Sequence, residues 1–167
     1  MALNAYLTLK GQKQGAINGS TTQKGREGTI VVHAFNHEVI SPRDPASGLP
    51  TGKRMHKPFV ITKDVDKSSP LLWSALTNNE NLTTWSLQCF TPAVVAAGGT
   101  GVEKQFYTIT LTNANVAGIY EFMPDNLDPA KVSLSLREQV TFTYQKITWT
   151  WTDGGITASD GWEAPVV

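Results

Sequence analysis

The chain has 167 residues, of which 40% are hydrophobic and 17% charged, and its 14 basic and 14 acidic side chains give a formal net charge of zero. This length predicts a single domain over residues 1–167, and the hydrophobic content excludes a disordered chain. The zero net charge argues against a nucleic-acid-binding protein, because such proteins usually carry a basic excess.

The N-terminal segment is expected to form a strand, and it does not show the pattern of a signal peptide. Apolar and mostly polar side chains alternate over residues 3–10, which predicts a half-buried strand. Residues 1–6 contain neither a basic start nor an apolar stretch of signal-peptide length. No segment approaches the roughly 20 apolar residues of a membrane helix. We therefore expect a protein that is made in the cytoplasm, carries no cleaved signal peptide and does not insert into membranes.

A β-branched run over residues 29–40 leads into a long excursion at residues 41–57. His33 and His37 lie in the run, and four residues of a strand separate them by about 13 Å, so we expect no shared metal ion. The excursion contains three prolines and two glycines. Loops of this length are usually functional or mobile. Its net charge is +3, from Arg43, Lys53, Arg54 and Lys57 against Asp44.

One short helix is expected between the strands. Ser69 is a good N-cap, and Pro70 suits the first helical position. These residues predict a helix over about residues 69–78, which covers one end or flank of the sheets.

Further alternating runs predict strands in the middle of the chain. They follow Pro58 and extend over residues 84–90 and 107–111. The run at 84–90 contains Cys89, the single cysteine, which excludes an intrachain disulfide framework and is expected to be a buried structural thiol. The Gly-rich segment 92–103 is expected to be a loop whose role the sequence leaves open.

The last long run changes parity. Apolar residues share one parity from residue 132 to residue 144, and after Gln145 and Lys146 the apolar set shifts to Ile147, Trp149 and Trp151. A single strand cannot do this without turning over, so we predict a bulge or sharp bend near Gln145–Ile147. The alternative is that both faces are covered there, one of them by a neighbouring subunit.

The C-terminal stretch 152–167 carries a charge of −3 from Asp153, Asp160 and Glu163. Oppositely charged projections at 41–57 and 152–167 suit electrostatic docking between copies of the chain. The alternative is that they are two solvated loops that never meet. Trp162, in a polar tail, is the best candidate for an interface anchor.

The sequence contains residue types that are used in catalysis, but their spacing does not match a known catalytic motif. The carboxylates are scattered, Cys89 has no histidine beside it in sequence, and no nucleophile elbow occurs. We therefore expect no enzyme, no cofactor and no metal site. A carbohydrate-binding β-sandwich that uses the five tryptophans remains an alternative.

Several stretches resemble the Hcp family, the haemolysin-coregulated proteins of type VI secretion. Pro42–Phe59 resembles the family's extended loop, Pro70–Leu76 its single helix, and Asp128–Lys131 and Gln139–Trp149 its closing strands. Asp160-Gly161-Trp162 is similar to a C-terminal motif of the family. The likeness spans nearly the whole chain in the same order and departs from the family at Pro92–Gly101, where the turn is longer.

The resemblance implies a mainly β fold, a compact β-barrel or sandwich of two sheets with one short flanking helix and a long extended loop. It implies a homohexameric ring that stacks into a tube, with sheath and spike proteins and secreted effectors as partners. A phage-type tail-tube protein is the alternative. We expect the interface between subunits or rings to involve Arg43, Asp44, Lys53, Arg54, His56, Lys57 and Trp162.

Overall fold

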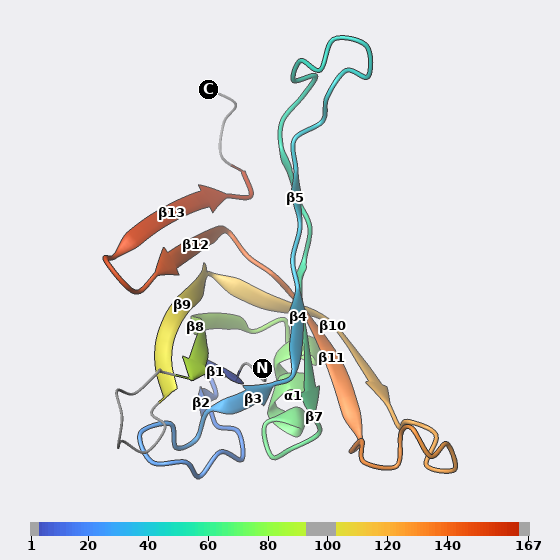
Figure 1. Cartoon of the computed structure of the whole chain (residues 1–167). Helices are drawn as coiled ribbons and strands as arrows, with labels where there is room; N and C mark the ends of the chain where they lie inside the picture. Colours follow the sequence, from blue (N-terminus) through green and yellow to red (C-terminus); the bar gives the residue numbers. More distant parts are fainter. Residues whose placement is uncertain (1–3, 93–102, 164–167) are drawn as a thin grey trace, which may run out of the picture.

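The computed structural model describes residues 4–92 and 103–163, and within these two ranges the chain forms thirteen strands and one helix (Figure 1). In chain order they are β1 (Asn4–Gly11), β2 (Gly15–Ile17), β3 (Ile30–Val32), β4 (Ala34–Asn36), β5 (Val39–Ile40), β6 (Met55–His56), β7 (Phe59–Asp64), α1 (Ser69–Thr77), β8 (Asn81–Pro92), β9 (Glu103–Thr112), β10 (Ala114–Phe122), β11 (Arg137–Thr143), β12 (Lys146–Trp151) and β13 (Ile156–Gly161). The predicted loop at 92–103 lies almost entirely outside the described residues.

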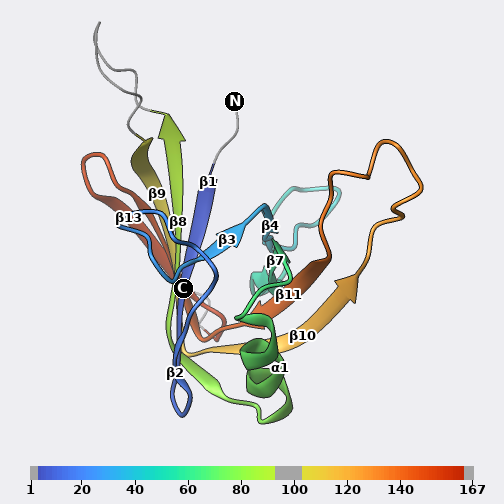
Figure 2. The ribbon, with the colours of Figure 1, turned by 90° about the horizontal axis from the view of Figure 1, so that it is seen from below.

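Eleven of the strands form one antiparallel sheet that curls around the core. Its order is β13-β12-β9-β8-β10-β11-β7-β4, and β1 pairs with β8, β2 and β3. Seen from below, β1 and β8 lie in one wall of the curl and β10 and β11 in the other, with α1 beside them (Figure 2). The remaining strands, β5 and β6, form a separate two-stranded sheet. The predicted mainly β fold with a flanking helix and a long extended loop is confirmed.

The sheet turns a corner where two neighbouring chain segments bend together. β9 ends at Thr112 and β10 begins after Asn113, whose φ of 49° lies in the left-handed region. β11 and β12 are separated by Tyr144 and Gln145. The Asn113 amide Nδ2 donates to Gln145 Oε1 at 2.6 Å, and the Gln145 N–H donates to the Thr112 carbonyl at 3.0 Å. The bend predicted near Gln145–Ile147 is therefore confirmed. Because the chain turns there, Ile147 is buried although its parity differs from that of the preceding strand.

The helix lies where the sequence places it, but its cap differs. α1 begins at Ser69, and its N-cap is Ser68, so the assignment of Ser69 as the N-cap is wrong by one residue. The cause is Asp66, which accepts hydrogen bonds from the Ser68 N–H and hydroxyl and brings the helix start forward. The Ser69 hydroxyl instead donates to Glu138 at 2.8 Å. Leu72 is fully buried and faces the core.

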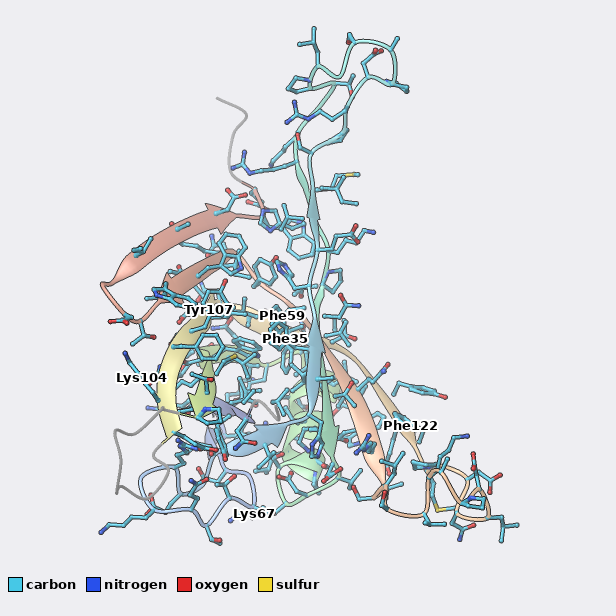
Figure 3. All side chains as sticks on the ribbon, in the orientation of Figure 1. Phe35, Phe59, Lys67, Lys104, Tyr107 and Phe122 are labelled. Atoms are coloured by element: carbon cyan, nitrogen blue, oxygen red, sulfur yellow. The ribbon has the colours of Figure 1, made fainter. Side chains whose placement is uncertain are left out.

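Aromatic rings fill the middle of the curl. Trp85 on β8 meets Phe59 on β7 and Phe142 on β11 edge to face, with centroids 5.0 and 5.5 Å apart. All three side chains have no solvent exposure. The ring of Phe35 on β4 stacks on the ring of Phe59, with the two centroids 5.5 Å apart (Figure 3). Cys89 is buried as a free thiol, which confirms its predicted structural role.

The strand expected from residue 132 onward begins only at residue 137. Residues 128–134 form successive turns, in which the Lys131 N–H donates to the Asp128 carbonyl and the Leu134 N–H to the Lys131 carbonyl. The prediction that Val132, Leu134 and Leu136 belong to the strand is wrong, because these turns carry the chain beyond the end of β10, whose last residue Phe122 pairs with Arg137. Their side chains are exposed.

Candidate functional site

Residues 41–57, which we call the arm, project away from the curled sheet (Figure 1). At the base, β5 and β6 pair through Val39 opposite His56 and Ile40 opposite Met55. A single bridge between Arg43 and Pro50 continues the pairing toward the tip. The arm is thus a two-stranded projection with little apolar material of its own to bury, so its direction must be set by contacts at its base.

The tip of the arm is a tight turn built on Asp44. Asp44 Oδ1 accepts hydrogen bonds from the N–H groups of Ala46 and Ser47, at 2.9 and 2.7 Å, and from the Ser47 hydroxyl. These donors hold the pKa of the Asp44 carboxyl below its usual value. Gly48 closes the turn with a φ of +72°, a conformation that favours glycine. Arg43 and Lys53 are exposed on either side of this turn.

The base of the arm is held against the rest of the protein by a polar and aromatic cluster. We call this cluster the latch, and its members are His37, Arg54, His56, Tyr144, Asp160 and Trp162. Arg54 binds Asp160 of β13 through Nε and Nη2, so that each carboxylate oxygen accepts one bond. His56 Nε2 lies 2.8 Å from the same Asp160 Oδ2.

Tyr144 joins both strands of the arm base to the corner of the sheet. Its hydroxyl lies 2.7 Å from His37 Nε2, just before β5, and 2.9 Å from His56 Nδ1 on β6. Trp162 closes the cluster: its ring stacks on His56 at 5.9 Å and meets Tyr144 edge to face at 5.1 Å. The backbone N–H of Trp162 donates to the backbone carbonyl of Gln145 at 2.9 Å, which fixes this tail beside the bend.

The charges in the latch perturb its titratable groups. The hydrogen bonds from Arg54 hold the pKa of the Asp160 carboxyl far below its ordinary value, with a smaller contribution from His56. Burial, with the nearby Asp160 charge, raises the pKa of the Tyr144 hydroxyl well above its ordinary value. Burial and the neighbouring His56 lower the pKa of His37. Asp160 is therefore a carboxylate and Tyr144 a neutral phenol at neutral pH.

The structure brings together three of the seven residues predicted from sequence. Arg54, His56 and Trp162 meet in the latch. Lys57 lies at the arm base and pairs with Glu38, with Nζ and Oε2 at 2.6 Å. The other three, Arg43, Asp44 and Lys53, belong to the outer part of the arm.

Three members of the latch, His37, Tyr144 and Asp160, are not among the site residues predicted from the sequence. The opposite charges of 41–57 and 152–167 did signal an attraction, but Arg54 and Asp160 satisfy part of it within one chain. From the sequence, His37 is expected only to share no metal ion with His33, and Tyr144 only to belong to the apolar set of the last run. Their meeting depends on the corner at Gln145, which brings β12 and β13 past the arm base.

The geometry does not support binding of a metal ion by His33 and His37. His33 pairs with Asp64 at 2.9 Å, and His37 turns to Tyr144, so the two histidines do not converge. Across residues 4–92 and 103–163, no group of three or more His, Cys, Asp or Glu side chains is arranged to hold an ion. In the same ranges no helix is long and apolar enough to cross a membrane.

A curled β-sheet with one flanking helix and a latched, projecting arm defines a class of β-rich protein. Residues 6–151 match the family described as "Type VI secretion system effector, Hcp". The chain is 43% identical, over 99% of both sequences, to the protein named "Major exported protein" of Pseudomonas aeruginosa. The chain belongs to the Hcp family of type VI secretion.

Solved structures agree with this assignment. A crystal structure of an Hcp protein matches 98% of this chain and all of its own with a TM-score of 0.87 and 31% identity. The secreted protein Hcp3 from Pseudomonas aeruginosa matches the same share of this chain with a TM-score of 0.76 and 37% identity. Hcp1 from the E. coli EAEC 042 pathovar matches 95% of the chain with a TM-score of 0.78 and 36% identity.

Proposed function

We propose that the protein is a structural subunit of the type VI secretion tube rather than an enzyme. In this proposal it forms homohexameric rings, the rings stack into a tube, and the tube holds effectors in its lumen. The single observation that carries the proposal is the latched arm, a charged projection whose base is held by the latch (Figure 1). Among residues 4–92 and 103–163, the tip at residues 42–51 makes hydrogen bonds only within itself.

A projection fixed in this way suits contact with another copy. A ring closes when each subunit presents two different and complementary surfaces, so that every contact repeats around the axis. The arm supplies one such surface, with Arg43 and Lys53 exposed near its tip. Because Arg54 is already paired with Asp160, we assign the contacts between copies to Arg43 and Lys53, with Asp44 shaping the turn between them.

The free edges of the sheet supply further surface for assembly. β13 is the terminal strand of the order and is exposed from Ile156 to Ser159, with no proline or lysine to block pairing. The short strand β4 lies at the opposite end of the order. Edges of this kind favour association with another strand, in keeping with a ring of like subunits.

The remaining partners and the route follow from the family. The relative from Pseudomonas aeruginosa is named as an exported protein and Hcp3 as a secreted one. We propose that this chain is likewise made in the bacterial cytoplasm and exported by the secretion machine itself without a cleaved signal peptide. Sheath and spike proteins of that machine are its proposed partners outside the tube.

The two alternatives have less support. The tryptophans do not gather into one sugar-binding platform, because Trp85 is fully buried, Trp162 stacks in the latch and Trp73 lies on α1. A phage-type tail-tube role would share the fold, but the family match is to type VI secretion proteins. Genes for a sheath and a secretion ATPase beside this gene, rather than for a capsid and terminase, would support the secretion role.

The experiment that tests the proposal reverses the charge at the arm tip. Arg43→Glu combined with Lys53→Glu should weaken assembly in analytical ultracentrifugation and leave the far-ultraviolet circular dichroism of the subunit unchanged. The matched control, Arg43→Lys with Lys53→Arg, keeps the charge at both positions and should assemble normally. Unchanged sedimentation of the charge-reversed variant would refute the role of the arm.

A further inference from the structure

One hydroxyl, that of Tyr144, ties down both strands of the arm base, and each of its two partners is a histidine. When both imidazoles are neutral, the hydrogen bonds run in one direction. His37 Nε2–H donates to the Tyr144 oxygen, the Tyr144 O–H donates to His56 Nδ1, and His56 Nε2–H donates to Asp160. Every polar atom named in this chain then has a partner.

A first added proton leaves all of these contacts intact. On His56 it places a second N–H on Nδ1, which donates to the Tyr144 oxygen, while Nε2–H keeps its carboxylate partner. The Tyr144 O–H then turns to donate to His37 Nε2, which carries its proton on the other nitrogen. The protonated ring then lies 2.8 Å from the Asp160 carboxylate, a partner of opposite charge.

A second proton, on His37, breaks the arrangement. Both rings would then point N–H groups at one hydroxyl oxygen, and the Tyr144 O–H would lose both of its acceptors. Two positive charges would also face each other across that hydroxyl, with Arg54 as a third positive charge bound to the same Asp160 carboxylate as His56. Burial and the charge of His56 both lower the pKa of His37, in line with this conflict.

The other groups around His37 do not relieve the conflict. Its ring packs on Phe59 at 5.2 Å and lies 6.2 Å from Trp149, and both neighbours are uncharged. The adjacent Glu38 carboxylate is paired with Lys57 at 2.6 Å. Asp160, the single carboxylate among the six latch residues, already binds both Arg54 and His56.

We propose that the latch is a pH-sensitive hinge, in which neutral His37 holds both strands of the arm base on Tyr144 and protonated His37 releases them. On acidification the strand that leads into β5 separates from Tyr144, and the arm gains mobility relative to the curled sheet. This hinge is a property of the subunit itself and does not rest on the proposed assembly.

The test follows hydrogen–deuterium exchange in the arm at about pH 7.5 and pH 4.5, corrected for the intrinsic rate at each pH, a range that extends well below the ordinary histidine value of 6.5 because the pKa of His37 is lowered. The protection of residues 41–57 in the wild-type chain should fall several-fold at the lower pH. His37→Phe keeps an aromatic ring but cannot take up a proton, so its arm should show the same protection at both values. The matched control is His33→Asn, which removes the histidine outside the latch and should retain the wild-type fall.

A second measurement needs no variant in the latch. The three histidine rings are labelled with carbon-13 and titrated by nuclear magnetic resonance, with His33→Asn used to assign the ring outside the cluster. The midpoint of the loss of arm protection should coincide with the titration of His37. Equal falls in the wild type and His37→Phe, a midpoint that follows His33, or no fall in the wild type would each overturn the proposal.

Discussion

Arg54 and Asp160 lie 106 positions apart in the sequence and form a bidentate ion pair that joins the arm to β13. The planar guanidinium donates from two nitrogens to the two oxygens of one carboxylate, a geometry that gives direction as well as attraction. The same carboxylate accepts from His56, so a single acidic side chain holds two residues of the arm. The orientation of the arm therefore depends on the C-terminal hairpin of the sheet.

Replacing Arg54 by lysine should loosen the arm although the charge is kept. Lysine has one point charge and cannot present the two-pronged donor, so Asp160 loses one of its bonds. We expect faster hydrogen–deuterium exchange in both the arm and β13. Arg43→Lys is the matched control, since it makes the same change in the same arm outside the latch. Equal exchange in the two variants would show that the bidentate pair does not orient the arm.

A second polar cluster, beneath α1, should contribute strongly to stability. The Lys63 ammonium on β7 lies 2.7 Å from Glu138 Oε1 on β11 and 3.0 Å from Asp66, and the side chains of Lys63 and Glu138 have no solvent exposure. Removing one partner of a buried pair leaves a charge without compensation and typically costs about 3–5 kcal/mol. We expect Lys63→Met and Glu138→Leu each to lower the free energy of unfolding in urea by about this amount.

The double variant distinguishes the pair from simple packing. Lys63→Met combined with Glu138→Leu removes both charges and leaves two apolar side chains, which is often close to neutral. The double variant should therefore be more stable than either single one. If the losses of the two single variants simply add, the ion pair is not the interaction that matters there.

The acid stability of the protein should depend on Asp160. Because its folded pKa lies below the ordinary value of 3.8, the folded state binds fewer protons than the unfolded state. The stability that this gives is present in full above the ordinary value and is lost as the pH falls below it. Asp160→Asn should thus be less stable at neutral pH but show a shallower loss between about pH 5 and the acid limit.

Asp153→Asn is the control for this measurement. Asp153 belongs to the same C-terminal stretch, but its side chain is 69% exposed in a surface pair with Lys104. Because an exposed ion pair contributes little to stability, its replacement should change the dependence of unfolding free energy on pH less than Asp160→Asn does. Identical acid limbs for Asp160→Asn and the wild type would contradict the assignment of Asp160.

The sequence allowed the strands and the corner to be predicted, because both depend on local alternation. Ile147 changes parity relative to Phe142, and the bend between them allows both side chains to be buried. The alternation from Val132 to Leu136 misled the prediction, since the turns anchored by Asp128 carry these residues past the end of β10. Periodicity does not report whether a partner strand is present.

The site could be predicted only in part, because the contacts that form it join residues far apart in the sequence. The opposite charges of the segments containing Arg54 and Asp160 are visible in sequence, but charge alone does not say whether they meet within one chain or between two. The meeting of His37 with Tyr144 joins residues 107 positions apart and requires the corner to be in place. Contacts of this kind depend on the tertiary arrangement and leave no local pattern.

Native mass spectrometry of the purified protein over a range of concentrations shows directly whether the chain assembles with copies of itself. The surfaces that we propose for this assembly are the arm and the two strands at the ends of the sheet order, β13 and β4. We expect a species of six times the subunit mass. A monomer at every concentration, up to tens of micromolar, would contradict it.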